Sequence, residues 1–587
     1  MIEATGAQIV VKLLERQGIT TVAGIPGGSV LPLYDELAKS SIRHVLVRHE
    51  QGGGFLAQGM ARSTGNPAVC IATSGPGAMN LLTAIADARA DSIPIVAITG
   101  QVTSSLIGTD AFQEVDTFGL SFPIAKHSVM VKSAAELLDV LPKAFSLAAS
   151  GRPGPVLVDI PRDVQTQKAT FESWPEPGRA VRRAEQFRSS PQEFASALSA
   201  AAVLLSQSAK PVLYAGGGCN SPEAASGIAR LLEVFPMPVV TSLMGIGCVP
   251  RDSACLLGMV GMHGSMAANR AMHDADAVVA VGARFDDRAT GLIRKFCPDA
   301  KIIHIDIDAA EVNKILPSGI SVIADAESAL PVLAGMIDEL DSERKAISAR
   351  KSWLDRLAGV RDKAEAKENA RIEASSRAKR GTSAGLGDGL ADPRSFIASI
   401  PAAMRAAGID PDTAIVTTDV GQHQMWTAQR YPFSRPRQFL TSGSLGTMGF
   451  GLPAAIGAAL ANPGRRVVCV SGDGSIMMNI QELATLAEEG LDVTVIVLDN
   501  GALGMVRQQQ ELLFARNFSA CLFAKSPDLA AIAAAFGLRT VDASEPGWEE
   551  AAFAGRGPRF LRVRIPQEEN VYPFVPAGKA NVEAIEG

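Results

Sequence analysis

The sequence has 587 residues, of which 47% are hydrophobic and 20% are charged, a balance typical of globular proteins. The formal net charge of −6 argues against a nucleic-acid-binding protein, which would carry a basic stripe. No apolar run reaches the roughly 18 residues of a membrane span, and no secretory signal is visible. The seven cysteines are scattered without a CxxC pair, so we expect reduced thiols, no zinc site and a cytoplasmic protein.

The first 165 residues alternate short apolar runs with helical patterns. The expected strands are 21–23, 44–47, 68–73, 94–99 and 156–160. The expected helices cover about 9–14, a segment from about 30, then 51–62 and 78–89. Strands that alternate with helices form parallel sheets covered on both faces. A polar, proline-containing stretch at roughly 165–191 is typical of a linker.

Two further α/β units follow, at 192–340 and 394–587. Their expected strands are 211–214, 239–241, 277–281 and 301–305, then 414–418, 466–470, 493–498 and 559–563. Between the two units, the pattern at 341–380 predicts a mixed-charge helix, and 381–389 has the glycine-rich composition of a flexible linker within 341–393. We therefore predict an α/β protein with three doubly wound parallel-sheet domains. The first and third units share a similar rhythm, so an ancient duplication is an open interpretation.

The third unit holds the strongest chemical signal. Gly472-Asp473-Gly474-Ser475 follows one expected strand and opens a helix, and Asn500 follows the next strand. Both motifs then lie at the carboxyl ends of strands in one sheet, where open α/β folds bind ligands. Glycines and a helix start favour a phosphate group, and the Asp473 and Asn500 oxygens suit Mg²⁺. An acidic turn beside an unrelated asparagine is the less favoured alternative.

Other segments extend this motif into a family resemblance. They are Gly24–Gly28, Arg48–Gly52, Ser74–Gly77, Gly108–Glu114, Gly151–Pro155, Gly282–Arg288 and Val571–Pro573. Together with the Gly-Asp-Gly motif they resemble the catalytic large subunit of acetohydroxyacid synthase (acetolactate synthase), a thiamine-diphosphate-dependent enzyme. The matches cover nearly the whole chain. The resemblance implies a pyrimidine-binding first domain, an FAD-binding middle domain and a diphosphate-binding third domain.

The resemblance also assigns residues to thiamine diphosphate and its metal ion. Glu50 matches the glutamate that hydrogen-bonds the pyrimidine ring and promotes loss of the C2 proton, and Met448 matches the residue beneath the bent cofactor. Asp473, Asn500 and the Ala502 carbonyl match the ligands of Mg²⁺. Further residues that match cofactor-contacting positions are Pro26, Pro76, Asn80, Val420, Gly421, Gln422, His423, Gly446, Gly472, Gly474, Ser475, Leu503, Gly504 and Met505.

The middle unit resembles an FAD-binding domain. Residues that match positions along the flavin are Arg152, Gly216, Gly217, Gly218, Thr241, Leu243, His263, Gly282, Arg284, Asp286, Arg288, Asp306 and Asp325. By itself, Gly216-Gly217-Gly218 is a weak signal, because glycines after a strand often form only a tight turn. The sequence contains neither a Walker A motif nor a GxGxxG after a strand.

The implied reaction decarboxylates pyruvate and joins the two-carbon unit to a second pyruvate or to 2-oxobutyrate. It is the first common step of branched-chain amino-acid biosynthesis. Arg284 matches the arginine that pairs with the carboxylate of the second acid. Gly28 matches a backbone N–H near the substrate oxygen, and Phe112 and Gln113 match pocket-lining positions. Gln509 takes the place of a tryptophan that favours 2-oxobutyrate in many synthases; a Gln-Gln-Gln run occurs in the isozyme I branch. The preference for 2-oxobutyrate is therefore open.

The resemblance implies active sites between subunits, so we expect a homodimer or homotetramer, together with a small regulatory subunit and no nucleic acid or membrane partner. Pyruvate oxidase and sulfoacetaldehyde acetyltransferase are the alternative enzymes. Gln113 and the segment Arg284–Arg288 argue against both. A non-catalytic FAD- or nucleotide-binding sensor is the alternative of another class; it predicts loss of Glu50 or of the magnesium ligands, and all are present.

Overall fold

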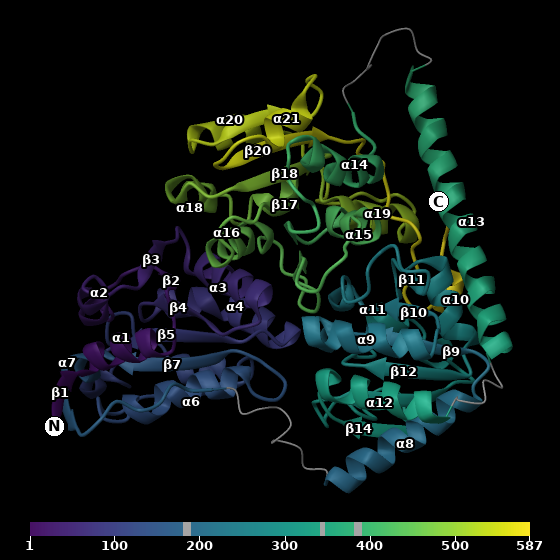
Figure 1. The fold of residues 1–587 in the computed structure, drawn as a ribbon. Helices are drawn as coiled ribbons and strands as arrows, with labels where there is room; N and C mark the ends of the chain where they lie inside the picture. Colours follow the sequence, from purple (N-terminus) through teal and green to yellow (C-terminus); the bar gives the residue numbers. More distant parts are fainter. Residues whose placement is uncertain (180–189, 341–346, 381–389) are drawn as a thin grey trace.

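The structure is a computed structural model that describes residues 1–179, 190–340, 347–380 and 390–587. It contains three six-stranded sheets, each covered by helices (Figure 1). The prediction of three parallel-sheet α/β domains is confirmed. In Figure 1 the N-terminal domain lies at the lower left, the middle domain at the lower right and the C-terminal domain at the top. Among the described residues, no helix has the length and apolar character needed to cross a membrane.

The N-terminal sheet has the strand order β3-β2-β4-β5-β7-β6, with all neighbours parallel. Its strands are β2 (Thr21–Gly24), β3 (Arg43–Leu46), β4 (Ala68–Ala72), β5 (Ile95–Gln101), β6 (His127–Met130) and β7 (Val156–Pro161). Its helices are α1 (Gly6–Arg16), α2 (Leu31–Leu37), α3 (Glu50–Thr64), α4 (Pro76–Asp91), η1 (Ser104–Leu106), α5 (Thr117–Ser121), α6 (Leu137–Ala149) and α7 (Arg162–Thr166).

The middle sheet has the order β11-β10-β9-β12-β13-β14 and is also parallel. Its strands are β9 (Pro211–Ala215), β10 (Val239–Thr241), β11 (Leu256–Met259), β12 (Ala277–Val281), β13 (Lys301–Asp306) and β14 (Ile320–Ile323). Its helices are α8 (Pro191–Gln207), η3 (Gly217–Cys219), α9 (Pro222–Val234), η4 (Leu243–Gly245), α10 (Met266–Asp274), α11 (Asp287–Thr290), η5 (Ile293–Lys295) and α12 (Ala326–Leu340).

The C-terminal sheet has the order β16-β15-β17-β18-β20-β19. Its strands are β15 (Ile415–Thr418), β16 (Phe439–Leu440), β17 (Val467–Gly472), β18 (Val493–Asp499), β19 (Arg539–Asp542) and β20 (Arg559–Arg564). Its helices are α14 (Pro393–Ala406), α15 (Gln422–Arg430), α16 (Gly451–Ala461), α17 (Asp473–Ile476), α18 (Glu482–Glu489), α19 (Gly504–Leu513), α20 (Leu529–Ala535) and α21 (Trp548–Phe553), with η7 (Asn581–Glu583) in the tail.

The strand orders distinguish the middle domain from the other two. Counted in chain order within each sheet, both the N-terminal and the C-terminal sheet run 2-1-3-4-6-5, whereas the middle sheet runs 3-2-1-4-5-6. The second order is that of dinucleotide-binding folds. The shared order of the outer domains agrees with the similar rhythm seen in the sequence.

The strands absent from the sequence-based prediction lie at sheet edges. They are β6, β11, β14, β16 and β19. All five have four residues or fewer, too short for the continuous apolar run that marks a central strand. The linker prediction at 165–191 was also wrong in part. Within that stretch, β8 (Lys168–Phe171) pairs with β1 (Ile2–Thr5) in an antiparallel two-stranded sheet.

The predicted charged helix is present as α13 (Ile347–Arg380), which runs along the right side of the molecule in Figure 1. The buried side chains of Trp353 and Leu357 pack into the core of the middle domain. The Trp353 indole donates to the Pro211 carbonyl at 3.1 Å. Residues 341–346 and the glycine-rich segment 381–389 lie outside the described residues.

Helices α3 and α16 join the N-terminal and C-terminal domains. Phe55 packs edge-on against Phe450, with ring centroids 5.5 Å apart. A Cβ atom placed on Gly59 would lie 2.1 Å from the Ala454 carbonyl oxygen, and one on Gly457 would lie 1.9 Å from that of Leu56. The two helix backbones are therefore in direct contact, and the buried cores of the two domains form one continuous cluster.

Candidate active site

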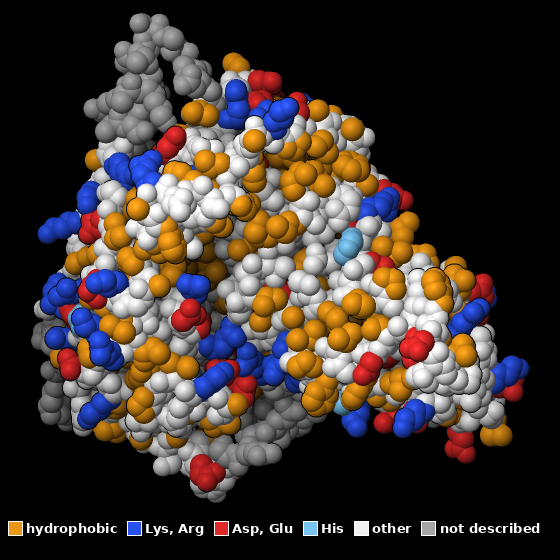
Figure 2. All heavy atoms as spheres, turned by 180° about the vertical axis from the view of Figure 1, so that it is seen from behind, with side chains coloured by type: hydrophobic (Ala, Val, Ile, Leu, Met, Phe, Trp, Pro, Cys, Tyr) orange, Lys and Arg blue, Asp and Glu red, His pale blue; other side chains and the backbone are white. Residues whose placement is uncertain are grey.

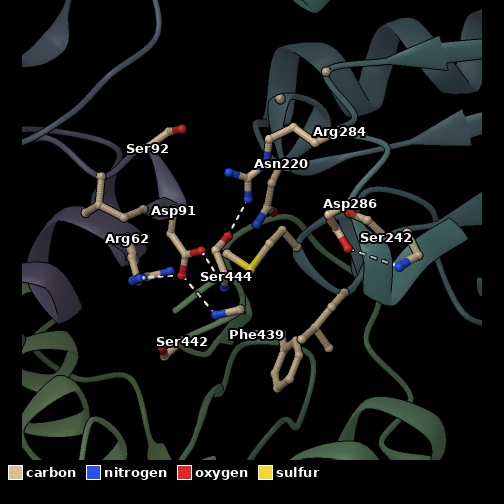
Figure 3. Close-up of a pocket in the computed structure, with 18 of the residues that line it drawn as sticks. Arg62, Asp91, Ser92, Asn220, Ser242, Arg284, Asp286, Phe439, Ser442 and Ser444 are labelled. Carbon is tan, nitrogen blue, oxygen red and sulfur yellow. Dashed lines mark hydrogen bonds and ion pairs between the residues drawn. The ribbon is translucent and has the colours of Figure 1, made fainter. Parts of the chain in front are cut away.

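A cavity of about 630 Å³ lies where the three domains meet. The N-terminal domain contributes residues of α3 and the end of α4, among them Arg62 and Asp91. The middle domain contributes segments that follow its strands, and the C-terminal domain contributes Met448 and Gln509. Figure 3 shows Arg284 reaching toward Ser444 in this cavity, with Arg62 and Asp91 on the opposite side.

A second cavity, of about 80 Å³, lies within the C-terminal domain. It is lined by three segments that follow β15, β17 and β18, namely 420–423, 472–475 and 500–506. Both motifs singled out in the sequence therefore lie at one edge of one sheet. Val420, Gly421, Met448, Met505 and Val506 line both cavities, so the two spaces adjoin.

Asp473 is buried in the small cavity and is held by the backbone. Its two carboxylate oxygens accept the N–H groups of Gly474 at 3.1 Å and of Gly501 at 2.8 Å. Burial, together with the nearby Asp499 carboxylate, raises the pKa of Asp473 to about 7. Within the described ranges no cluster of three or more His, Cys, Asp or Glu side chains is placed to hold a metal ion. A cation here would need amide, carbonyl and ligand oxygens in addition, which suits Mg²⁺.

His423 and the surrounding helix starts fit an anionic ligand. The His423 Nε2 atom is buried without a hydrogen-bond partner in the described part of the chain. Burial lowers the pKa of His423 to about 3, so its imidazole is neutral. Helices α15 and α19 begin at Gln422 and Gly504, beside the same cavity, and their first N–H groups favour a bound phosphate. These features fit the diphosphate of thiamine diphosphate.

The crevice of the middle domain lies between β9 and β12, at the switch point of its strand order. A Cβ atom on Gly218 would lie 2.7 Å from the Gly282 Cα atom, and one on Gly216 would lie 2.1 Å from the Gly282 carbonyl oxygen. The two glycine segments thus approach as closely as backbones allow, and they leave a cradle that a side chain would close. Such a cradle fits the dinucleotide expected from the sequence.

Most residues predicted to contact the flavin line the large cavity. They are Arg152, Gly217, Gly218, Leu243, His263, Gly282, Arg284, Asp286, Arg288, Asp306 and Asp325. Gly216 and Thr241 do not line it. Two of these side chains also form interactions within the protein. Arg152 forms ion pairs with Asp308 at 3.1 Å and Glu311 at 2.6 Å, and Asp286 caps α11 by accepting the N–H groups of Arg288 and Ala289.

The residues of the N-terminal domain that were predicted to contact thiamine diphosphate or substrate form a separate group that lines neither cavity. They are Pro26, Gly28, Glu50, Pro76, Asn80 and Gln113. Asn80 donates to the Glu50 Oε2 atom at 2.9 Å, and a Cβ atom on Gly77 would lie 3.2 Å from Glu50 Oε1. A Cβ atom on Gly28 would face open space. This group and the small cavity therefore share no lining residue.

Sequence reasoning missed the buried acids at the edge of the large cavity. Asp87 and Asp91 lie one turn apart on α4, in a segment otherwise rich in alanine. Their side chains are fully buried and both pair with Arg62. Two acids on the apolar face of a helix are a sequence signal in themselves, because carboxylates are almost never buried unless paired.

Comparisons with known proteins agree with this geometry. Models of the thiamine pyrophosphate enzyme domains match at 4–120 (N-terminal TPP binding domain), 198–333 (central domain) and 419–563 (C-terminal TPP binding domain). The chain is 48% identical to the acetolactate synthase isozyme 1 large subunit of Escherichia coli, over 99% of this chain and 97% of that protein. It is 40% identical to a probable acetolactate synthase large subunit of Methanocaldococcus jannaschii, over 98% and 94%. The chain belongs to the acetolactate synthase large subunits.

Membership of this family confirms the resemblance seen in the sequence. The protein is a thiamine-diphosphate-dependent carboligase of the transferase class. The roles of single residues at the two cavities remain predictions, because they rest on position and geometry alone.

We predict that Gly504→Ala weakens thiamine diphosphate binding about tenfold, the equivalent of one or two hydrogen bonds. The new Cβ would lie 2.1 Å from the Gln422 Oε1 atom. It would displace a side chain that donates to Gln508 at 3.0 Å and to the Glu569 carbonyl at 2.8 Å. Calorimetric titration of the cofactor into the apo-protein measures the effect. Gly335→Ala, whose Cβ faces open space in α12, is the control, and equal affinities in both variants would contradict the prediction.

Proposed function

We propose that this acetolactate synthase binds thiamine diphosphate and Mg²⁺ in the small cavity and the second 2-oxo acid in the large cavity. The chain decarboxylates pyruvate and condenses the two-carbon unit with a second pyruvate or with 2-oxobutyrate. This is the first common step of branched-chain amino-acid biosynthesis. The observation that carries the proposal is that the two cavities adjoin across Met448, Met505 and Val506.

The small cavity provides the donor set that magnesium diphosphate requires. Asp473, Asn500 and the Ala502 carbonyl would hold Mg²⁺, and the buried Asp473 becomes a full anion when the cation arrives. Asn500 is already oriented, because its Oδ1 atom accepts the Ala502 N–H at 3.0 Å. His423 and the first N–H groups of α15 and α19 would receive diphosphate oxygens.

When bound, thiamine diphosphate supplies a nucleophilic carbon that attacks the 2-oxo group of pyruvate and accepts the electron pair left when carbon dioxide departs. Glu50 would hold a proton at its carboxylate oxygens, hydrogen-bonded to the cofactor's pyrimidine ring. Asn80 fixes the orientation of that carboxylate through the 2.9 Å bond to Oε2. Arg284 would bind the carboxylate of the second acid with its planar guanidinium.

Glu50 lines neither cavity, and we propose that a second copy of the chain brings it to the small cavity. Large apolar side chains are exposed beside both parts. In the N-terminal domain they include Met79, Phe112, Phe118 and Phe122, with Phe112 88% exposed. In the C-terminal domain they include Leu445, Met477, Met478 and Leu522. Seen from behind, hydrophobic side chains form patches on the upper part of the molecule (Figure 2). The same view shows a hollow near the middle of this face.

Exposed apolar surface of this extent is typical of an interface. We therefore propose a homodimer, alone or paired into a homotetramer, whose active sites combine Glu50 of one copy with Asp473 of the other.

The relatives are named large subunits, and we propose that this chain also works with a small regulatory subunit. All seven cysteines are free, which supports a reducing, cytoplasmic location.

FAD is the second cofactor of the proposal. The glycine cradle between β9 and β12 would take the pyrophosphate. Asp306 ends β13 and Asp325 follows β14, the next two strands along the sheet. The His263 Nδ1–H donates to the Pro573 carbonyl at 3.1 Å. Burial lowers its pKa to about 4, so it adds no charge to the crevice.

A mixing experiment tests the shared site. We predict that Glu50→Gln slows catalysis by about 10²–10⁴-fold, as expected for a proton-transfer group, and that Asp473→Ala abolishes tight binding of the cofactor with Mg²⁺. When the two inactive variants are unfolded together, mixed and refolded, half of the dimers are hybrids, and one of their two sites is intact. Activity then returns to about a quarter of the wild-type value. Refolded single variants are the controls, and no recovery on mixing would contradict a site shared between chains.

A glycine substitution tests the flavin site. We predict that Gly218→Ala lowers the flavin absorbance per chain of the purified protein, because its Cβ would lie 2.7 Å from the Gly282 Cα atom. Gly335→Ala in the same domain has open space around its Cβ and should keep its flavin. Circular dichroism separates loss of flavin from loss of fold. An unchanged flavin content in folded Gly218→Ala would contradict the assignment.

Substrate choice is tested at Gln509, which lines the large cavity. A flexible amide gains little from the extra methyl group of 2-oxobutyrate, so we predict product ratios close to the ratio of the two acids supplied. Gln509→Trp should raise the preference for 2-oxobutyrate by about tenfold, the lower end of what one methylene contributes. Gln509→Leu, apolar but without a flat ring, serves as the control for polarity. A strong wild-type preference that Gln509→Trp leaves unaltered would remove Gln509 from the second-substrate pocket.

A further inference from the structure

The loop at 441–448, here called the cofactor loop, connects β16 to α16 and carries Gly446 and Met448. It contains no helix or strand, and Gly446 adopts the left-handed backbone with φ +69°. A loop without regular hydrogen bonds holds its shape only if other groups satisfy its N–H groups. The question is therefore which groups fix this loop, since Met448 lines both cavities.

Helix α4 of the N-terminal domain supplies those groups. The Asp91 carboxylate accepts two successive backbone N–H groups, that of Gly443 at Oδ2 and that of Ser444 at Oδ1, each at 2.9 Å. One turn earlier, Asp87 Oδ1 accepts the Thr447 hydroxyl at 3.0 Å and the hydroxyl of Ser442. The N-terminal domain therefore holds the beginning and the end of the cofactor loop through two acids.

The same turn of α4 also holds Arg284 from the middle domain. One guanidinium nitrogen of Arg284 donates to the Ala90 carbonyl at 2.7 Å, and the other donates to the Ser444 hydroxyl. Figure 3 shows the resulting row of Arg62, Asp91, Ser444 and Arg284, joined by dashed lines. The cofactor loop and the substrate-binding arginine thus share one anchor, although they belong to different domains.

The anchor is a buried cluster of one arginine and two acids, Arg62, Asp87 and Asp91. Arg62 pairs with Asp87 at 3.2 Å and with Asp91 at 2.9 Å, and its side chain is only 4% exposed. Burial disfavours ionisation of Asp91, but Arg62 and the bonds from Ser444 and Gly443 outweigh that effect and lower its pKa. Burial, with Asp91 close by, raises the pKa of Asp87.

A buried ion pair of this kind seldom adds stability over a well-packed apolar group. A carboxylate does provide two equivalent acceptors for two successive N–H groups, which an amide side chain cannot do. The Asp91 carboxylate therefore fixes the positions of two backbone N–H groups, and it adds little to the stability of the fold.

We propose that Asp91 is a positioning residue for the condensation step, acting through Ser444 to set the place of Arg284 relative to the cofactor loop. The inference rests on the proposed role of Arg284 in binding the second acid. Asp91 itself touches neither cofactor nor substrate in this account. It fixes the N–H of Ser444, and thereby the hydroxyl that receives the Arg284 guanidinium.

The test uses Asp91→Asn, Ser444→Ala and the double variant. In Asp91→Asn one of the two N–H groups loses its acceptor, so the amides of residues 443 and 444 should exchange with deuterium faster in the protein without added cofactor. Ser444→Ala keeps both N–H bonds and should leave that exchange unchanged. Both variants should raise the KM for 2-oxobutyrate at fixed pyruvate, by about fivefold to tenfold for loss of one charged hydrogen bond. The double variant should raise it no further than Asp91→Asn alone.

Asp276→Asn is the matched control. Asp276 also accepts two successive backbone N–H groups, those of Ala209 at 2.8 Å and Lys210 at 3.0 Å, and it lines neither cavity. It should lose thermal stability without a change in the KM for 2-oxobutyrate. If Asp91→Asn behaves in the same way, or if its effect adds to that of Ser444→Ala, the positioning role is overturned. Ser444 is exposed, so Ser444→Ala carries the test even if Asp91→Asn does not fold.

Arg284→Lys separates this inference from the proposal beneath it. A normal KM for 2-oxobutyrate in Arg284→Lys would overturn the role of Arg284 and the inference with it. A raised KM in Arg284→Lys, with normal values in Asp91→Asn and Ser444→Ala, would overturn the inference alone. Raised values in all three, with a non-additive double variant, would support both.

Discussion

The backbone contact between α3 and α16 is the constraint on which the active-site region depends. Gly59 and Gly457 let the two helices approach until each faces a carbonyl oxygen of the other. No larger residue fits either position without moving a backbone. This contact fixes the N-terminal domain against the C-terminal domain, so that α4 lies beneath the loop that carries Met448. The anchor formed by Arg62, Asp87 and Asp91 exists because the helices are held this close.

The parallel sheets supply the second element of the arrangement. In each sheet the strands run in one direction, so the segments that follow them gather at one edge. The edges of the C-terminal and middle sheets open into adjoining cavities. At the large cavity, glycines at 216–218 and at 282 let two backbone segments approach each other closely. The small cavity is lined by buried polar groups such as Asp473 and His423. Two different ligand sites result from one architectural rule.

The central strands and the Gly-Asp-Gly motif were predictable because their signals are local. A buried central strand is a continuous apolar run, and a strand followed by Gly472–Ser475 places the motif at the sheet edge without knowledge of the rest of the fold. The edge strands β6, β11, β14, β16 and β19 were not predictable in this way, since each has four residues or fewer. The pairing of β1 with β8 was missed for a related reason. It joins segments far apart in the chain, and neither has an apolar run of its own.

The sequence by itself determined the fold class, the family and the residue types available for the chemistry, because these follow from periodicity and from short motifs. Only the tertiary structure decided which of those residues meet. It leaves Glu50 out of the lining of the small cavity, while it brings Arg284, Ser444 and Asp91 together from three domains. Such contacts depend on how domains dock, and docking is set by surface shape and buried charge over distances that no sequence pattern spans. The acids of α4 illustrate this: in the sequence they are two aspartates on an alanine-rich helix, and in the fold they hold a loop of the opposite domain.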